Sequence, residues 1–261
     1  MSSASIPREE NHEGGSAMAG TKDFPFKLLI VGGGPAGCSV IVRAIRMGCI
    51  ENLCRDDEDT MLAGLCIIDK SSEARFGGGR LQDYAINSNT YANKFASSVL
   101  DDKPVSIPPE KCTGTSLERL RTTENCQQLL DIGSKQGPLQ VVGKFLHDVG
   151  ACVSQTLAQY PNTCKCRHET NVTAVQRYIR NDGMIGWQVS IMEERGPESF
   201  VFAKDVLFAT GGRQDAPVLS NSLHNCKVLN RYYSQNHLGR AFLKLATAIL
   251  IVTRTTSITA L

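Results

Sequence analysis

The chain of 261 residues is poor in aromatic side chains and in net charge. It contains nine Phe, six Tyr and one Trp, and its 28 basic and 26 acidic residues leave a formal charge of +2. Scarce aromatic residues argue against stacking platforms for single-stranded nucleic acid, and the charge balance argues against a basic nucleic-acid surface. We therefore expect a small-molecule substrate and no nucleic-acid partner. The sequence indicates no particular oligomeric state.

Long apolar runs are also lacking. Residues 1–23 carry no apolar core of a secretory signal, and their three glutamates argue against an acid-poor transit peptide. Residues 241–252 are mostly apolar, but this run is too short for a bilayer and includes Lys244. These features predict a cytoplasmic protein without a membrane span.

The ten cysteines do not follow a disulfide framework. They are scattered, and several of them, such as Cys38, Cys66 and Cys152, fall within apolar segments. Without a secretory signal, this placement favours reduced, buried thiols over disulfides. Cys164 and Cys166 are one residue apart, but no second Cys or His pair has zinc-site spacing. We therefore predict no metal site.

Strand and helix patterns begin after a polar N-terminal segment. Residues 1–23 hold too few bulky apolar side chains to offset the entropy of ordering, and we predict a disordered tail there. Residues 27–31 and 65–69 are short apolar runs typical of doubly buried strands. A helix is expected from Pro35 to Gly48, where apolar residues recur at helical spacing. This alternation predicts an α/β fold with a mainly parallel sheet and helices on both faces.

Further along, the pattern changes to an irregular loop, a helix and a run of strands. Residues 76–93 are rich in Gly, Asn and Ser and are predicted to form an irregular loop. Apolar residues at helical spacing predict a helix over residues 139–153. Strand signals follow at four places, namely 172–179, 187–191, 200–202 and 205–209. Turns at Asn181-Asp182-Gly183 and Gly196-Pro197 are predicted between the first three of them.

A glycine-rich motif joins the first strand to the first helix. Gly32-Gly33-Gly34-Pro35-Ala36-Gly37 matches the dinucleotide-binding pattern G-x-G-x-x-G in its required strand–turn–helix context. Gly32 permits the tight turn, Gly34 lets a pyrophosphate approach the backbone, and Gly37 lets the helix pack on the strand. The helix N-terminus supplies free N–H groups for phosphates. A glycine-rich turn without a ligand is the alternative.

An acidic residue stands where the motif needs one. A carboxylate at the end of the second strand binds ribose hydroxyls in such sites, and Asp69 ends that strand. Asp69 lies 32 residues beyond Gly37, because a polar insert between Cys49 and Met61 lengthens the connection. A surface carboxylate at the strand end is the alternative.

These features together resemble the FAD-binding domain of the two-dinucleotide-binding-domain flavoproteins, which include monooxygenases and glutathione-reductase-like enzymes. The resemblance covers residues 26–213 and rests on the glycine motif, Asp69, a three-stranded meander, and the segment Leu207-Phe208-Ala209-Thr210-Gly211-Gly212. It implies a Rossmann-like FAD/NAD(P)-binding domain at residues 24–213, with a mainly parallel sheet and a three-stranded antiparallel meander. Residues 214–261 are then a partial or divergent C-terminal segment.

The resemblance also implies FAD as cofactor and further residues near it. The strand end at Ala209, Thr210 and Gly211 would pass close to the cofactor, with an ordinary strand-to-loop turn as the alternative. Val172 opens the meander and would approach the adenosine through its backbone. The backbone after the ribose-binding acid would run along the cofactor. Lys70, which directly follows Asp69, is therefore a further expected cofactor-binding residue.

A glycine run after the second strand raises two possibilities. Gly77-Gly78-Gly79-Arg80 could approach the cofactor, with Arg80 offsetting pyrophosphate charge. It could equally be a flexible loop with a solvated arginine.

The sequence departs from the resembled family in three respects. A second G-x-G-x-x-G is absent, no cysteine pair of a flavin disulfide reductase follows the second strand, and no Gly-Asp signature follows Gly212. These departures indicate a truncated or divergent member. No catalytic residue is assigned, and His147 is expected to be a hydrogen-bonded histidine of the core.

The leading interpretation is an FAD-dependent oxidoreductase that acts on an unknown small molecule, with a monooxygenase as the suggested type and NAD(P)H as a candidate electron donor. One alternative is a non-catalytic dinucleotide-binding remnant or regulatory module. A second alternative is an NAD(P)-dependent dehydrogenase, in which the meander would be unexplained.

Overall fold

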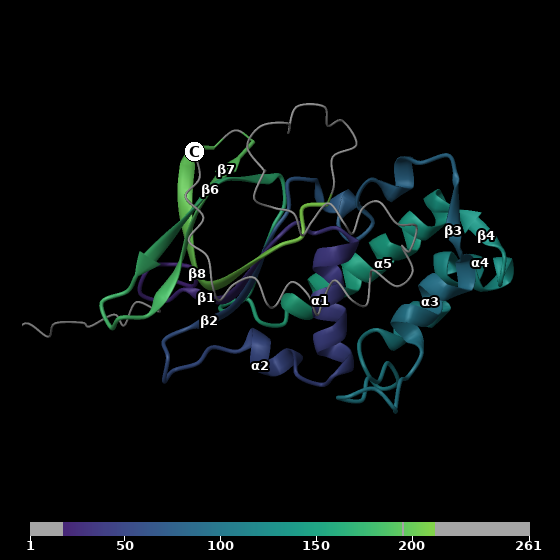
Figure 1. Cartoon of the computed structure of the whole chain (residues 1–261), viewed down its shortest axis with the longest axis horizontal. Coiled ribbons are helices and arrows are strands. Elements are labelled where there is room, and N and C mark those ends of the chain that lie inside the picture. The colour runs from purple at the N-terminus through teal and green to yellow at the C-terminus, as the bar shows by residue number, and fades with distance from the viewer. Residues whose placement is uncertain (1–17, 195, 212–261) are drawn as a thin grey trace, which may run out of the picture.

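A computed structural model of the chain describes residues 18–194 and 196–211 (Figure 1). Residues 1–17 of the predicted tail and the predicted segment 214–261 lie outside the described residues, whereas residues 18–23 form a turn ahead of the first strand. The main sheet has six strands in the order β5-β2-β1-β8-β7-β6. Its strands are β1 (Phe26–Val31), β2 (Ala63–Ile68), β5 (Lys165–Arg167), β6 (Thr170–Ile179), β7 (Ile185–Glu193) and β8 (Glu198–Phe208).

The parallel half of this sheet forms because β1 and β2 are apolar on both faces. Five of the six β1 residues have a partner in both β2 and β8. The pairs run from Phe26, opposite Ala63 and Ala203, to Val31, opposite Ile68 and Phe208. All six residues of β2 are buried. The predicted mainly parallel sheet and α/β class are thus confirmed.

Strand β8 differs from the prediction in length. Two separate strands were expected at residues 200–202 and 205–209, but β8 runs without a break from Glu198 to Phe208. Its first half pairs antiparallel with β7 and its second half pairs parallel with β1, and Ala203 belongs to both ladders. The predicted four strands are therefore three, and these three form the antiparallel meander β6-β7-β8. The polar pair Lys204-Asp205, where the two predicted strands meet, is exposed on the continuous strand.

Within residues 18–194 and 196–211 the helices lie on one face of the sheet, where the sequence predicted helices on both faces. One apolar cluster joins the helices to Ile30, Leu65 and Ile67. The alternate strand residues, such as Leu29 and Ile68, belong to a second cluster whose buried members in the described residues all come from β1, β2, β7 and β8. The twisted meander therefore covers the face that a second helical layer was expected to cover.

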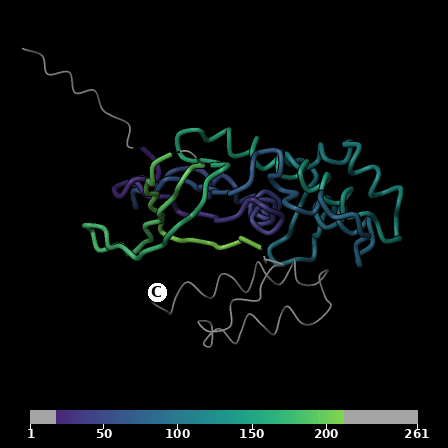
Figure 2. Tube along the Cα trace, turned by 90° about the horizontal axis from the view of Figure 1, so that it is seen from above, coloured from purple at the N-terminus to yellow at the C-terminus, as the bar shows by residue number. Residues whose placement is uncertain are grey.

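A small second sheet and the helices α3 and α4 lie at the end of the molecule away from the meander (Figures 1 and 2). The α-helices are α1 (Pro35–Arg46), α2 (Ile50–Cys54), α3 (Ala92–Leu100), α4 (Glu124–Ile132) and α5 (Leu139–Leu157), and the second sheet pairs β3 (Asn87–Tyr91) with β4 (Gln136–Pro138). Short 3-10 helices are η1 (Glu73–Arg75), η2 (Gly79–Asp83) and η3 (Glu118–Thr122). The predicted irregular loop at residues 76–93 is thus wrong in part, because it contains η2 and β3. The sequence does not indicate β3, because its side chains are polar and Ser88 is the only one that is buried.

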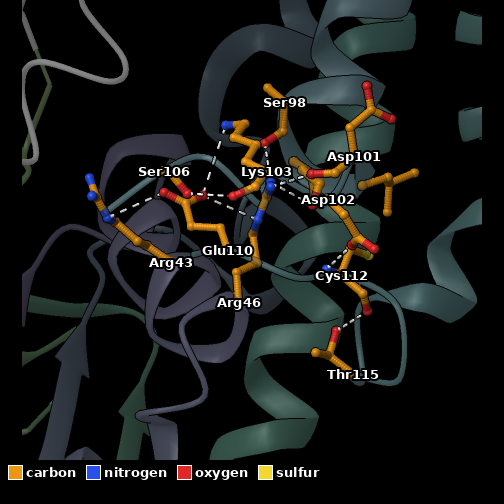
Figure 3. A network of polar contacts seen from close by, with 12 residues as sticks. Arg43, Arg46, Ser98, Asp101, Asp102, Lys103, Ser106, Glu110, Cys112 and Thr115 are labelled. Atoms are coloured by element: carbon orange, nitrogen blue, oxygen red, sulfur yellow. Dashed lines mark hydrogen bonds and ion pairs between the residues drawn. The ribbon is translucent and has the colours of Figure 1, made fainter. Parts of the chain in front are cut away.

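A buried ion pair joins the last turn of α1 to α3 and the segment after it (Figure 3). Arg46 is 3% exposed, and its Nε lies 3.3 Å from Oε2 of Glu110, which is 5% exposed. The same guanidinium donates to the carbonyl oxygens of Ser98, Val99 and Asp101 at the end of α3. A cation at a helix C-terminus interacts favourably with the helix dipole, so Arg46 both caps α3 and neutralises Glu110.

No helix within residues 18–194 and 196–211 is long and apolar enough to cross a membrane.

Candidate functional site

The sequence-predicted residues meet at the carboxyl ends of three neighbouring strands. Because Val31 is in register with both Ile68 and Phe208, strands β1, β2 and β8 end at the same level. Gly32, Asp69 and Ala209 follow these ends directly. In open α/β sheets ligands bind outside the carboxyl ends of parallel strands. The register therefore brings together the glycine motif, the acidic residue and the β8 strand end.

Two glycines of the motif are required for packing. Gly32 has a positive φ of 110°, and a Cβ on it would lie 2.4 Å from the carbonyl oxygen of Ala209. A Cβ on Gly37 would lie 1.9 Å from the carbonyl oxygen of Gly32. These positions let the chain turn out of β1 and let α1 pack directly against the turn, in agreement with the roles predicted for them.

Gly34 has a different environment, because none of the residues that the structure describes crowds it. A Cβ on Gly34 would meet no atom of the described residues within 4 Å, and its φ of −74° is accessible to any residue. Gly34 is the N-cap of α1 and makes no side-chain cap, Pro35 follows it, and the first turn holds no acidic residue. The first N–H groups of a helix lack partners within the helix, so those of Ala36 and Gly37 remain for a ligand. The arrangement suits an anion close to the backbone of Gly34.

Asp69 lies beside this turn and is held there by the backbone. Its N–H donates to the carbonyl oxygen of Arg167 at 2.8 Å, and its own carbonyl accepts from Thr170 at 3.0 Å. The carboxylate accepts a hydrogen bond from the Ser71 N–H at 3.3 Å. Burial raises the pKa of Asp69, and hydrogen bonds from the N–H groups of Ser71 and Gly33 oppose this rise. A carboxylate accommodates about four hydrogen bonds, which leaves capacity for hydroxyl donors.

The Gly77–Gly79 run serves mainly to pack α5 against the glycine motif. A Cβ on Gly77 would lie 2.2 Å from the carbonyl oxygen of Leu146, and one on Gly78 would lie 2.4 Å from that of Gly143. The Gly77 N–H also donates to the carbonyl of Gly33 at 2.8 Å. Packing against α5 thus explains why residues 77 and 78 are glycines. The approach of this run to a cofactor stays a prediction.

Gly79 and Arg80 lie at the open end of this run. A Cβ on Gly79 would approach Pro35 Cδ only to 3.7 Å, which places η2 beside the start of α1. The Arg80 side chain is exposed, as is Lys70 directly after Asp69. Their predicted contacts with a cofactor stay predictions.

The remaining predicted residues lie at the two ends of the meander. The Ala209 N–H donates to the carbonyl of Val31 at 2.7 Å, which fixes the β8 end against the turn, and Thr210 and Gly211 beyond it are exposed. Val172 pairs with Ile191 in β7 and packs against the second apolar cluster. It stands two residues after Thr170, whose N–H binds the carbonyl of Asp69.

Sequence reasoning did not identify Phe76 and His168 as part of this region. The Phe76 ring closes over Gly33, because a Cβ there would lie 2.4 Å from it, and it contacts the His168 ring edge-on with centroids 5.0 Å apart. The His168 Nδ1 is buried without a hydrogen-bond partner among the described residues. The one sequence signal for Phe76 is its position directly before the glycine run.

His147 is hydrogen-bonded, as predicted. Its Nδ1 lies 3.1 Å from the carbonyl oxygen of Phe76. A hollow of about 340 Å³ adjoins it, lined by Glu73, Ala74, Phe76, His147, Ala151 and Ser154. The lining comes from η1, Phe76 and α5, and Gly33 is not part of it.

Comparison with known proteins finds solved structures of low sequence identity and low structural similarity. No protein-family model and no curated protein matches the chain. The ornithine hydroxylase PvdA from Pseudomonas aeruginosa is 14% identical, with a TM-score of 0.49 and coverage of 76% of this chain and 42% of that chain. The bacillithiol disulfide reductase Bdr from Bacillus cereus is 15% identical, with a TM-score of 0.39 and coverage of 76% and 45%. The flavin-dependent monooxygenase PieE, solved with FAD and substrate, is 14% identical, with a TM-score of 0.34 and coverage of 73% and 31%.

The chain thus spans less than half the length of each of these three proteins. The strand order and the β6-β7-β8 meander confirm the fold that the resemblance to FAD/NAD(P)-binding domains implied.

Proposed function

We propose that the carboxyl edge of β1, β2 and β8 binds the adenosine diphosphate half of FAD, and that the protein is an FAD-dependent oxidoreductase acting on a small molecule. The observation that supports this most directly is the pairing of an open, uncapped helix N-terminus at Gly34 with a buried carboxylate at Asp69. Phosphates favour the first and ribose hydroxyls the second.

Each end of this half-site has a distinct task. The N–H groups of the first turn of α1 bind the pyrophosphate, and Gly34 leaves the space that the phosphate oxygens need. Asp69 accepts hydrogen bonds from the ribose hydroxyls. Ala209, Thr210 and Gly211 border the cofactor from the β8 side, and the exposed Arg80 and Lys70 add positive charge near the phosphates.

The residues present fit this group. Gly32 and Gly37 are closed to any side chain, whereas the space beyond Gly34 is free of the described residues. The helix N-terminus also fits a phosphate, because the first turn of α1 lacks acidic side chains and presents the positive end of the helix dipole.

FAD, when bound, supplies a ring system that accepts and donates electrons. The chain's own residues bind and orient the adenosine end. Phe76 excludes water from the back of the glycine motif, because its ring fills the space beside Gly33. NAD(P)H as electron donor and a small-molecule substrate complete the proposal.

The decisive experiment is a cofactor titration of the purified full chain. Its visible spectrum is recorded first, and flavin-free protein is then titrated with FAD, FMN, NAD and ADP. We expect binding of FAD, competition by ADP, and much weaker binding of FMN, which lacks the adenosine that Asp69 recognises. A protein that binds NAD but not FAD would contradict the flavoprotein assignment and favour a dehydrogenase.

A matched pair of variants then tests the site. Asp69→Asn is expected to weaken FAD binding by about 1–3 kcal/mol, because it removes a charged acceptor of hydroxyl hydrogen bonds. Asp205→Asn removes an exposed carboxylate from the same sheet and serves as the control. Equal affinities in the two variants would contradict the ribose assignment. Reduction of the bound flavin by NADPH or NADH supports an enzyme, whereas bound flavin that is never reduced favours a non-catalytic module.

A further inference from the structure

The hollow of about 340 Å³ beside His147 lies between η1 and α5. One wall is a single face of α5, because His147, Ala151 and Ser154 follow each other at spacings of four and three residues. The other wall consists of Glu73 and Ala74 from η1 together with Phe76. Each wall contains an alanine, and these short side chains leave the space between the walls open.

Backbone contacts hold the two walls together. The Phe76 N–H donates to the carbonyl of Glu73 at 3.0 Å, and the Phe76 carbonyl oxygen lies 3.1 Å from the His147 Nδ1. Directly after Phe76, a Cβ on Gly77 would lie 2.2 Å from the carbonyl oxygen of Leu146. The chain therefore crosses α5 in direct backbone contact. Such a preformed hollow spares a ligand the cost of ordering the chain around it.

The contact with Phe76 determines the hydrogen-bonding role of His147. A carbonyl oxygen can only accept, so the Nδ1 of His147 carries the proton that it donates to Phe76. In the neutral imidazole the other ring nitrogen, Nε2, is then an acceptor. This Nε2 has no hydrogen-bond partner among the residues that the structure describes. The α5 wall thus offers a fixed acceptor.

The η1 wall adds a negative charge that the described part of the chain does not neutralise. Glu73 is exposed and forms no ion pair within residues 18–194 and 196–211. Two arginines near it in the fold are engaged elsewhere, because Arg75 pairs with Asp83 at 2.6 Å and Arg167 pairs with Glu193 at 3.4 Å.

The lining therefore has a definite chemical character. It contains one carboxylate, one imidazole nitrogen and the Ser154 hydroxyl, whose oxygen can accept hydrogen bonds through its lone pairs. It contains no Lys or Arg. The alanine methyl groups and the Phe76 side chain form its apolar part. A ligand that suits this lining carries a positive charge, donates several hydrogen bonds and has a short apolar body.

We propose that the hollow is a second ligand site, which binds a small primary amine as its ammonium ion. An ammonium group has three N–H donors, and the lining provides three acceptors in Glu73, the His147 Nε2 and Ser154. The hydrogen bond to the carboxylate is charge-assisted and is therefore the strongest of them. The carbon body of the amine packs against Ala74, Phe76 and Ala151. An anionic ligand is disfavoured, because it would meet the Glu73 carboxylate.

This site is separate from the proposed FAD site. Phe76 is the one lining residue to which the FAD site assigns a role, and that role concerns the space beside Gly33. The amine and the adenosine half of FAD are therefore expected to bind at the same time.

Titration of the flavin-free full chain with benzylamine, followed by NMR, tests the proposal. The imidazole signals of His147 are identified by their absence from the His147→Gln spectrum. Benzylamine is expected to shift them with a Kd of about 1 mM, the range of a ligand of this size. Benzyl alcohol has the same number of non-hydrogen atoms but no charge, and it is expected to bind at least about tenfold more weakly. Absence of a shift with benzylamine, or equal affinity for the alcohol, would overturn the proposal.

Matched variants locate the amine in the hollow. Ala151→Leu fills the space between the walls and is expected to weaken benzylamine binding at least about tenfold. Ala158→Leu is the control, because Ala158 is the exposed C-cap residue of α5 and is not part of the lining. Its affinity is expected to equal that of wild type. Equal losses in the two variants would refute the assignment to the hollow.

A second pair of variants tests the charge. Glu73→Gln is expected to weaken benzylamine binding about tenfold, whereas Glu58→Gln, which changes an exposed glutamate of another segment, is expected to leave it unchanged. Equal affinities in these two variants would contradict the role of Glu73. If circular dichroism shows that Ala151→Leu does not fold, this pair decides the question.

Saturation with ADP distinguishes the hollow from the adenosine site. Benzylamine affinity is expected to be the same with and without ADP. Loss of benzylamine binding in the presence of ADP would show that the hollow belongs to the nucleotide site and would overturn the proposal of a second site. A chain that binds benzylamine but neither FAD nor ADP would contradict the proposed FAD site and leave the amine site supported.

Discussion

Two glycine-rich turns meet behind the end of β1, and they differ in what lies beyond their Cα atoms. A Cβ on Gly34 in the first turn would meet no described atom within 4 Å, whereas one on Gly77 in the second turn would meet the backbone of α5. The Gly77 N–H binds the Gly33 carbonyl, so the two turns form one structure with an open side and a closed side. Glycine content alone therefore does not identify a ligand site. The atoms that a Cβ would meet distinguish a ligand-facing glycine from a packing glycine.

The largest effect is expected from a side chain on the closed side. In Gly77→Ala the new Cβ would meet the Leu146 carbonyl oxygen at 2.2 Å, and the φ of 80° is unfavourable for alanine. Strain and overpacking together are expected to lower the free energy of unfolding by about 3 kcal/mol or more. Urea denaturation measures this change.

Gly183→Ala provides the matched control for Gly77→Ala. Gly183 has a similar φ of 86° in the β6–β7 turn, but a Cβ there meets no described atom within 4 Å. Its cost is expected to be about 1–2 kcal/mol, from backbone strain alone. Equal losses in the two variants would show that packing against α5 adds nothing.

A side chain on the open side is expected to affect binding more than folding. Gly34→Ala keeps an allowed φ and meets no described atom, so unfolding should change by about 0.5–1 kcal/mol through the poorer N-cap. Its Cβ occupies the space assigned to the pyrophosphate, and FAD affinity is expected to fall at least about tenfold, or 1.4 kcal/mol. Fluorescence titration with FAD measures this. Unchanged affinity would remove the main support for the proposed site.

A smaller loss of stability is expected from the α5 side of the same contact. In Gly150→Ala the Cβ would lie 2.6 Å from the Phe76 carbonyl oxygen and 2.8 Å from the Gly77 Cα. Overpacking opposes the gain in helix propensity, which is about 1 kcal/mol, so we expect a net loss of about 1 kcal/mol. Thermal unfolding compared with wild type checks the sign. A stabilised variant would show that α5 can move away from the turn.

The smallest effect concerns the charge beside the open side. Burial raises the pKa of Asp69, so the folded chain holds this proton to higher pH than the unfolded chain does. Between the two pKa values the folded state binds more protons, and the free energy of unfolding therefore decreases as pH rises through this window. Urea denaturation of the wild-type chain and of Asp69→Asn from about pH 3 to 7 measures this effect. The free energy of unfolding of wild type minus that of the variant should decrease as pH rises through this window. A difference that instead grows with pH would mean that the ionised carboxylate is stabilised.

FAD affinity should have the opposite dependence on pH. The ionised carboxylate is the better acceptor for ribose hydroxyls, so affinity is expected to fall as pH falls through the raised pKa of Asp69. A pH-independent affinity of the wild-type chain would contradict this role.

The sequence predicted the parts of the fold whose signals are local. The apolar runs of β1 and β2, Pro35 at the first turn of α1 and the turn at Asn181-Asp182-Gly183 each specify their own conformation, and the structure confirms them. The glycine motif and Asp69 were also placed correctly at one edge, because parallel strands share their carboxyl ends.

Features that depend on distant contacts were not predictable in this way. The sequence analysis did not predict helices α3 and α4. Helix α3 is stabilised in part by Arg46 of α1, whose guanidinium donates hydrogen bonds to carbonyl oxygens at the end of α3. Gly77 and Gly78 have the same sequence appearance as a ligand loop, and only Gly143 and Gly150 on α5 reveal their purpose. The seven-residue spacing of these two glycines places them on one helix face, which was an available but unused signal.

The continuous strand β8 has a consequence for the order in which the protein forms during synthesis. Strand β1 is made near the start of the described chain, yet one of its two neighbours, β8, emerges from the ribosome only near its end. Until residues 203–208 arrive, one side of β1 exposes unpaired N–H and C=O groups next to apolar side chains. Such an edge invites pairing with another nascent chain. A ribosome stalled just before β8 therefore holds a chain that is more prone to aggregate than one stalled just after it.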